Sequence, residues 1–422
     1  MTTHASIMQW TSSRIFQEFF MDRETRILAI CLGAIAALGP FAMDMYLAAM
    51  PKMAADLGAA EGEIELSVMA FFVGFCGGQL VLGPLSDRTG RKPVVYFGLA
   101  MFFISSIGCI FAGSVHDLML WRLLQGIGGS IGMVIAMSSV RDKFSGQMAA
   151  RMMSMVVIVL GLAPVISPII GATLLTFGPW QWIFYALAFL SAVVFVIVWR
   201  FMPEPRSPEA RAQSNPRHAL RNYGRLLVNR DFVPYAGAMA LTQGGFFAYL
   251  SSASVVLIGY YGLTPLEFSA AFAVNAIGLT LMARFSHKLI ARYGAVTLAR
   301  RAMAFRAAVT LVMTLLLVIG ELTLPAFLVT CFFFVGSLGL VMPTCSLLAL
   351  DRQGKLAGTA SALMGACGFG FGALGALAVG LLTDGSAMAL VVVITVATVS
   401  ALVLALTTFS DEAGMQPLPA SS

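Results

Sequence analysis

The stretch MPEPRSPEARAQSNPRHALRNYGRLLVNRD, residues Met202–Asp231, is the longest polar segment between the apolar runs of the sequence. It is rich in Pro, Ser and Arg, which is typical of a linker rather than of a packed element. Six apolar runs precede it and six follow it. The stretch therefore predicts two halves of similar size joined by a polar connection.

The runs on either side have the length of membrane spans. Hydrophobic residues make up 59% of the 422 positions and charged residues 11%, a charged share less than half that of a soluble domain. A helix needs roughly 20 mostly apolar residues to cross a bilayer. The expected spans are 27–49, 64–85, 93–113, 117–140, 152–176, 181–202, 232–260, 266–290, 298–320, 323–350, 356–383 and 386–409. We predict an all-α membrane protein with twelve transmembrane helices in two six-helix bundles.

The basic residues indicate an orientation. With a cytoplasmic N-terminus, only Lys52 of the 26 Lys and Arg falls on an outer loop and only Arg122 lies well within a span, leaving 24 at or near the inner face. Basic residues are retained on the cytoplasmic side during insertion, so the distribution supports both the helix count and two cytoplasmic termini. The outer loop after the first span is expected to be solvated, and its acids are Asp56, Glu61, Glu63 and Glu65.

The expected organisation follows from the spans and the linker. It comprises a cytoplasmic N-terminal segment (1–26), an N-terminal bundle (27–202), a cytoplasmic linker (203–231), a C-terminal bundle (232–409) and a cytoplasmic tail (410–422). No cleaved signal peptide is evident before the first span. The net charge of +6 is a topology signal, so we expect no nucleic-acid partner. The expected state is a monomer in the lipid bilayer.

Two ionisable residues are expected well within the spans, Asp44 in the first and Arg122 in the fourth. A charge at the bilayer centre costs about 2.5 kcal/mol or more, so it rarely persists without a partner or a function. Each lies about five positions from the outer end of its span, roughly 7 to 8 Å, so the two share a depth. Burial and a nearby guanidinium act oppositely on a carboxyl, which suits proton exchange at Asp44. The alternative is a static ion pair that pins the two helices.

The connection between the second and third spans reads GPLSDRTGRKP, Gly83 to Pro93. A carboxylate and an arginine four positions apart can form a hydrogen-bonded latch to a neighbouring helix end. We expect this latch to hold the two bundles together when the inner gate is shut, and the alternative is a plain charged loop. The candidate latch residues are Asp87, Arg88, Arg91, Arg141 and Asp142.

The fourth and fifth spans are rich in small residues. RLLQGIGGSIG begins at Arg122, and GLAPVISPIIG runs from Gly161 to Gly171. Small residues allow close helix approach, and prolines bend a span. The candidate bending residues are Gly161, Pro164, Pro168 and Gly171, and close packing is the alternative role for the glycines.

Aromatic and amide side chains within the spans are candidates for lining a substrate cavity. Burial of an amide is costly unless it is hydrogen-bonded, which favours cavity positions for Gln243 and Asn275. The candidate set is Phe41, Tyr46, Phe71, Gln243, Phe247 and Asn275. An enzyme would need histidines, paired acids or a metal constellation at membrane depth, so we expect neither catalysis nor a metal site.

Three motifs together resemble a known family. GPLSDRTGRKP, RLLQGIGGSIG and the proline-containing fifth span are similar, in order, to the signatures of drug:proton antiporters of the major facilitator superfamily. Within that superfamily, AMDMYLAAMP (42–51), VRD (140–142) and LAGTASAL (356–363) resemble the bicyclomycin and chloramphenicol resistance subgroup, Bcr/CflA. By this resemblance Asp44 matches the acid of the first helix, Arg122 the arginine tied to proton coupling, and Asp87 with Arg91 the cytoplasmic latch.

The resemblance implies a proton-coupled multidrug exporter of the bacterial inner membrane that works by alternating access. Its substrates would be neutral antimicrobials similar to bicyclomycin or chloramphenicol, and it would use the transmembrane proton gradient without a cofactor. A proton-coupled symporter or facilitator for a sugar or amino acid is the alternative. The sequence departs from the pattern in two places: no proline follows Leu47, and the loop SHKLIARYGAVTLARR of the second half lacks an acid like Asp87.

Overall fold

The computed structural model describes residues 23–410, and the predicted count of spans is confirmed: twelve helices in this part of the chain are long and apolar enough to cross a membrane. Ten spans are single helices: α2 (Arg23–Leu47), α4 (Glu61–Thr89), α5 (Arg91–Ile110), α8 (Gly146–Phe177), α9 (Gln181–Phe201), α13 (Pro265–Tyr293), α14 (Ala295–Val318), α15 (Leu324–Asp351), α16 (Ala357–Leu382) and α17 (Met388–Thr408). The predicted boundaries of these spans lie within a few residues of the observed ones.

Two spans change geometry along their length. The fourth is divided at Ser130 into α6 (Val115–Gly129) and α7 (Ile131–Lys143). The seventh begins as α12 (Val233–Ser254) and ends in a π-helical segment, Val255–Tyr260. Among the described residues, three short α-helices lie outside the spans: α3 (Met50–Leu57), α10 (Pro208–Ala212) and α11 (Pro216–Leu226). The linker between the halves therefore contains two helices.

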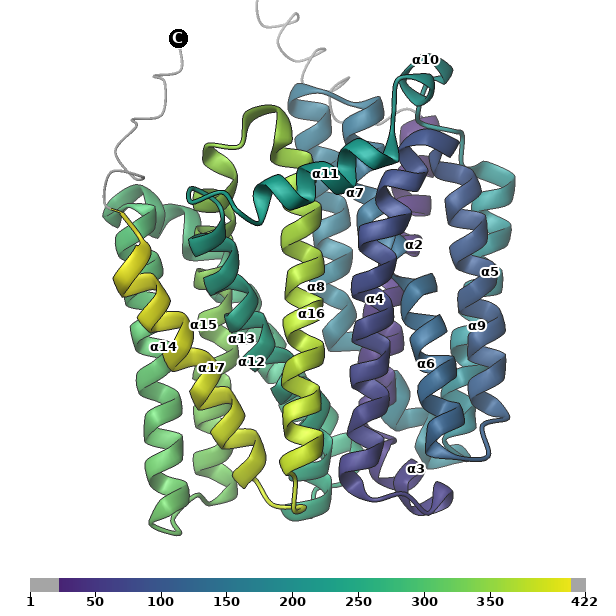
Figure 1. Cartoon of the computed structure of the whole chain (residues 1–422). Coiled ribbons are helices and arrows are strands. Elements are labelled where there is room, and N and C mark those ends of the chain that lie inside the picture. The colour runs from purple at the N-terminus through teal and green to yellow at the C-terminus, as the bar shows by residue number, and fades with distance from the viewer. Residues whose placement is uncertain (1–22, 411–422) are drawn as a thin grey trace, which may run out of the picture.

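The spans form two six-helix bundles that stand side by side (Figure 1). The bundles meet where α4 lies along α16. Gly62 packs against the backbone of Gly380 at one end of this seam, and Gly365 faces the Gln79 side chain further along it. A second contact joins α8 to α13, where the buried Ser269 hydroxyl donates to the Pro168 carbonyl (2.9 Å). The two contacts place any central cavity between the bundles.

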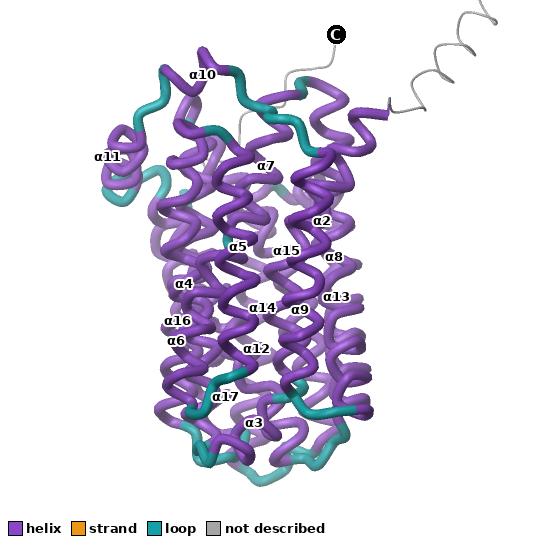
Figure 2. Tube along the Cα trace, turned by 90° about the vertical axis from the view of Figure 1, so that its right-hand side faces the viewer, coloured by secondary structure: helices purple, strands orange, loops and turns teal. Residues whose placement is uncertain are grey.

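Both described ends of the chain lie at the same end of the molecule as α10 and α11, whereas α3 lies at the opposite end (Figures 1 and 2). The turn between α4 and α5 is also at the α10 end, where Gly90 adopts a φ of 102°. A residue with a Cβ rarely adopts such a φ, so glycine suits this tight reversal. The segments 1–22 and 411–422, which include most of the predicted cytoplasmic tails, lie outside the described residues.

The solvated-loop prediction is wrong for Glu65. This residue is fully buried (0% exposed) and belongs to α4, which begins at Glu61. Glu65 already falls within the expected span of 64–85, and α4, which starts three residues before that span, turns this acid inward. Asp56 and Glu63 are exposed, as expected.

A second correction concerns Arg306, which was counted among the basic residues near the inner face. It lies in the middle of α14 and is 1% exposed. Its guanidinium sits 3.8 Å above the centre of the Phe334 ring and donates to the Phe334 carbonyl. The described spans therefore hold two arginines that are buried away from the helix ends, Arg122 and Arg306.

Candidate functional site

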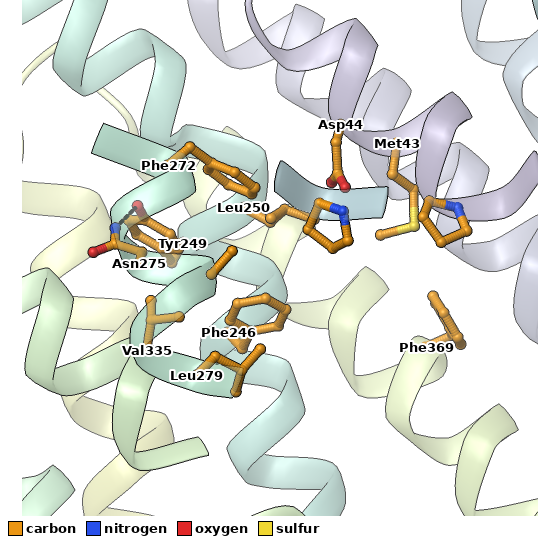
Figure 3. A pocket seen from close by; sticks show the side chains of 13 residues that line it. Met43, Asp44, Phe246, Tyr249, Leu250, Phe272, Asn275, Leu279, Val335 and Phe369 are labelled. Carbon is orange, nitrogen blue, oxygen red and sulfur yellow. Dashed lines mark hydrogen bonds between the residues drawn. The ribbon is translucent and has the colours of Figure 1, made fainter. Parts of the chain in front are cut away.

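A cavity of about 150 Å³ lies between the bundles (Figure 3). Helices α2 and α8 line it from the N-terminal bundle, and α12, α13, α15 and α16 line it from the C-terminal bundle. Its lining residues are Pro40, Met43, Asp44, Pro164, Phe246, Tyr249, Leu250, Phe272, Asn275, Ala276, Leu279, Val335 and Phe369. Drug-sized ligands occupy pockets of about 300 to 1,000 Å³, so this cavity is in a contracted form.

Asp44 supplies the only carboxyl among the thirteen lining residues (Figure 3). It is 4% exposed, and the Ser167 hydroxyl of α8 donates to its Oδ2 at 3.3 Å. On the opposite wall, the Asn275 amide donates to the Tyr249 hydroxyl at 2.8 Å. The cavity thus presents one acidic wall and one neutral polar wall, with apolar side chains between them.

An aromatic cluster joins the bundles beside the cavity. Phe75 of α4 lies 4.1 Å from Phe369 of α16 between ring centroids, and Phe369 stacks on Phe247 of α12 at 4.9 Å. Phe72 of α4 contacts Phe247 at 4.7 Å. Such pairs contribute about 0.5 to 1.5 kcal/mol each beyond burial. This cluster holds the cavity shut along the side where α4 meets α16.

Arg122 is fully buried but forms no ion pair with Asp44. Its Nη1 donates to the Ala42 carbonyl of α2 (3.0 Å) and to Gln125 Oε1 (2.6 Å). Its guanidinium lies 4.2 Å from the ring centre of Tyr46 and 4.4 Å from that of Phe71. The static ion pair considered as an alternative is absent from this structure. Arg122 instead connects α6 to α2 through a carbonyl two residues before Asp44.

Of the six candidate cavity residues, only Asn275 lines the cavity. Tyr46 and Phe71 stack on Arg122, and Phe247 belongs to the aromatic cluster. The Gln243 side chain packs closely on Gly368 of α16.

Phe41 packs partly buried against the core beside the cavity. A helical sequence gives the depth of a side chain but not the rotation of the helix about its axis, which accounts for these different positions. Tyr249, Phe246 and Phe369 were missed for the same reason.

A groove of about 690 Å³ follows the halves of α2 and α8 that lie toward the α10 end of the molecule. Its α2 residues are Arg26, Ala29, Ile30, Gly33, Ala34 and Ala37. Pro40 and Asp44, which line the cavity, continue the same helical face of α2 at spacings of three and four residues. The groove therefore leads from the end of the molecule where α10 lies toward Asp44.

The candidate latch forms an ion-pair network. Arg91, which is buried, bonds Asp87 at 2.7 Å and Asp142 at the end of α7 at 2.8 Å. Arg206 of the linker bonds Asp142 at 2.9 Å and lies 3.6 Å from Asp87. All these residues belong to the N-terminal bundle or the linker. The network therefore fastens α4, α7 and the linker to one another, not one bundle to the other as predicted.

Two candidate latch residues lie outside this network. Arg88 is exposed, and Arg141 donates to Ser138 within its own helix (3.3 Å). Arg141 also lies beside Gly358 of α16, the one candidate latch residue placed against the second bundle.

The linker contributes contacts that sequence reasoning missed. The Glu204 carboxylate accepts from the backbone N–H groups of Arg91 and Lys92, both at 2.9 Å, and so caps the start of α5. Tyr223 of α11 is buried, and burial, together with the nearby Asp87 carboxylate, raises its pKa to about 12. The only sequence signal that could have indicated this cap is the position of Glu204 between two prolines, shortly after the sixth span.

The four predicted bending residues of α8 lie in different environments. Pro164 lines the cavity, and Pro168 accepts the bond from Ser269. A Cβ at Gly171 would lie 2.5 Å from the Met45 carbonyl oxygen of α2, whereas a Cβ at Gly161 would meet nothing within 4 Å. Gly171 is therefore a packing residue.

Twelve spans in two bundles around a central cavity define a membrane transport protein. The Major Facilitator Superfamily model matches residues 30–376, which is most of the chain, so the protein belongs to this superfamily. Residues 23–410 hold no cluster of three or more His, Cys, Asp or Glu side chains suited to a metal ion.

The chain is 32% identical over 350 residues to the MFS-type transporter YdgK of Bacillus subtilis, covering 81% of this chain and 86% of YdgK. It is 29% identical over 355 residues to a bicyclomycin resistance protein homolog of Haemophilus influenzae, covering 84% and 88% of the two chains. It is also 29% identical over 257 residues to the multidrug resistance protein MdtL of Escherichia coli, covering 61% and 64%.

Solved structures share the fold. The chain is similar to a D-xylose-proton symporter (TM-score 0.72, 14% identity, 91% of this chain and 98% of the symporter). It is also similar to a bacterial homolog of the lysosomal transporter Spinster (TM-score 0.73, 14% identity, 94% and 100%). At this identity the likeness establishes the architecture alone.

Proposed function

We propose that this protein is a proton-coupled exporter of antimicrobials in the bacterial inner membrane, with both termini in the cytoplasm. The observation that carries the proposal is the position of Asp44, the only carboxyl lining a mostly apolar cavity between the bundles. The relatives named for bicyclomycin and multidrug resistance support drugs as the cargo. Expected substrates are neutral compounds similar to bicyclomycin or chloramphenicol.

The cavity favours such cargo for chemical reasons. Phe246, Phe272 and Phe369 offer apolar contact, and the Tyr249–Asn275 pair offers neutral hydrogen-bonding groups. A transporter of multiply charged anions would require several basic residues in this place, but none lines the cavity. A small aromatic or alicyclic molecule with a few hydroxyl or amide groups fits this lining.

The exchange follows from alternating exposure of one carboxyl. Asp44 takes up a proton when the cavity faces outward, and releases it when the cavity faces the cytoplasm and drug enters. The groove along α2 and α8 supports an inner route to this residue. Because the cavity is smaller than a drug, the bundles must separate across the aromatic cluster before cargo binds.

A susceptibility panel in a pump-deficient bacterium tests the proposal. Expression of the wild-type protein should raise the inhibitory concentrations of chloramphenicol or bicyclomycin relative to the empty vector, and Asp44→Asn should not. Unchanged susceptibility to every drug, together with sugar or amino acid uptake driven by an inward proton gradient, would establish the symporter instead. The structural likeness to the D-xylose-proton symporter is the observation that keeps this second candidate.

A further inference from the structure

We propose that the linker and the end of α4 form a binding site for the headgroup of an anionic phospholipid. The site is a pocket of about 510 Å³ on the surface at the α10 end of the molecule, remote from the central cavity. Its lining residues are Arg88, Arg211, Ala212, Gln213, Ser214, Asn215 and His218. Every ionisable residue in this lining is basic.

The basic side chains of the pocket have one exposed acid nearby, Glu209, which interacts electrostatically with Arg211, and solvent screens such an exposed pair. In the described part of the chain, neither Arg88 nor Arg211 forms an ion pair, and the Nε of Arg211 is buried without a hydrogen-bond partner. Three other neighbouring acids are engaged elsewhere: Asp87 and Asp142 bond Arg91 and Arg206.

Glu204, the third neighbouring acid, caps the start of α5. The pocket also lies at the N-terminus of the eleven-residue helix α11, where free N–H groups favour an anion. A phosphate is the group that two guanidiniums and a helix N-terminus bind best.

The position of α11 favours a lipid over a free phosphate. The helix lies across the ends of α4 and α16 on the outer flank of the bundles (Figures 1 and 2). Leu226 of α11 is buried against the protein, whereas Leu220 of α11 is 58% exposed and Leu227, which directly follows the helix, is 55% exposed. A helix with this pattern at the end of the spans lies in the membrane interface. Phosphate groups of the lipid layer are at this depth, and the exposed leucines can contact acyl chains.

Occupation of the pocket would connect the two halves of the transporter. Arg88 belongs to α4 of the N-terminal bundle, Arg211 belongs to the linker, and α11 packs on α16 of the C-terminal bundle as well as on α4. A bound headgroup would therefore brace the seam between α4 and α16. This inference concerns binding and does not depend on which cargo the protein carries.

The test measures the thermal unfolding midpoint of the purified full-length protein with increasing dioctanoyl-phosphatidylglycerol, dioctanoyl-phosphatidylcholine or inorganic phosphate. A ligand that binds only the folded state raises this midpoint. We expect phosphatidylglycerol to raise it saturably, and the other two to leave it unchanged. Arg211→Gln and His218→Gln should each raise the phosphatidylglycerol concentration that gives half of the full shift, by roughly tenfold for Arg211→Gln. Arg225→Gln, an exposed arginine on the same helix outside the pocket, should respond like the wild type.

Three results would overturn the assignment. Equal responses of Arg211→Gln, His218→Gln and Arg225→Gln would show that the lipid acts on general surface charge. A matching shift with inorganic phosphate would make the ligand a soluble anion, and one with phosphatidylcholine would exclude recognition of anionic headgroups. The unfolding midpoint does not depend on transport, so this test can succeed or fail independently of the proposed drug export.

Discussion

Four charged residues are buried within the described spans away from the latch: Asp44, Glu65, Arg122 and Arg306. Asp44 and Arg122 could be placed within the membrane from their apolar surroundings alone, because a charge is costly there. Their partners could not be predicted: the Ser167 hydroxyl donates a hydrogen bond to Asp44, and Arg122 donates one to a backbone carbonyl. Arg306 escaped prediction because it follows Arg300 and Arg301 closely, so it resembled a basic helix end. Depth is encoded locally, whereas partners depend on how neighbouring helices rotate.

Arg306→Lys tests whether the planar guanidinium, rather than the charge, stabilises the C-terminal bundle. Lysine keeps the charge but loses the stacking on Phe334 and the donor geometry toward Ser337. We expect the unfolding free energy to fall by about 1 to 2 kcal/mol. The unfolding midpoint from differential scanning fluorimetry in detergent measures this, with the exposed Arg284→Lys of the same bundle as the control. Equal unfolding midpoints for the two variants would show that the stacking adds nothing.

At the scale of helices, the sequence predicts existence and approximate bounds, because spans need long apolar runs. It misses the break at Ser130 and the π-helical end of the seventh span. Both occur within apolar sequence and carry no charge or proline signal. The pattern of small residues in the fifth span correctly indicates close packing, but only structure shows which glycine makes the contact.

Gly171→Ala and Gly161→Ala separate packing from bending within one helix. The added methyl group at position 171 would meet the Met45 carbonyl beside Asp44, whereas position 161 is open. Gly171→Ala should lower stability by about 1 to 3 kcal/mol, and Gly161→Ala should be neutral or stabilising by up to about 1 kcal/mol. Unfolding midpoints measure both. If Gly161→Ala were the more damaging substitution, bending at that position would matter more than the α2–α8 contact.

Asp142→Asn tests the network that fastens the linker to the N-terminal bundle. The substitution removes the charged partner of Arg91 and Arg206 in a place where the Asp142 side chain is 16% exposed. We expect the free energy of unfolding to fall by roughly 2 to 3 kcal/mol. Asp231→Asn is the control because its ion pair with Arg352 is largely exposed, and such pairs contribute less than about 1 kcal/mol. Similar losses for both variants, measured by chemical unfolding, would contradict a cooperative network.

The whole molecule follows from few sequence features. Hydropathy gives the spans, the polar linker divides them, and GPLSDRTGRKP points to the superfamily that the comparisons establish. The central cavity could not be derived in the same way, because its walls come from six helices and depend on how the bundles meet. The linker helices were also missed, since their short polar sequence resembles an unstructured connection. In the proposed mechanism, the motion of whole bundles changes the exposure of one residue, Asp44.

Drug-driven proton release in proteoliposomes is the most direct test of proton coupling through Asp44. The purified protein is reconstituted with a pH-sensitive dye, and chloramphenicol or bicyclomycin, whichever the panel identifies, is added across the membrane. The wild type and Asp384→Asn, a substitution in the exposed turn between α16 and α17, should release protons in proportion to drug transported. Asp44→Asn should lose drug-dependent proton release while remaining folded. Unchanged coupling in Asp44→Asn would remove this residue from the mechanism and contradict the account.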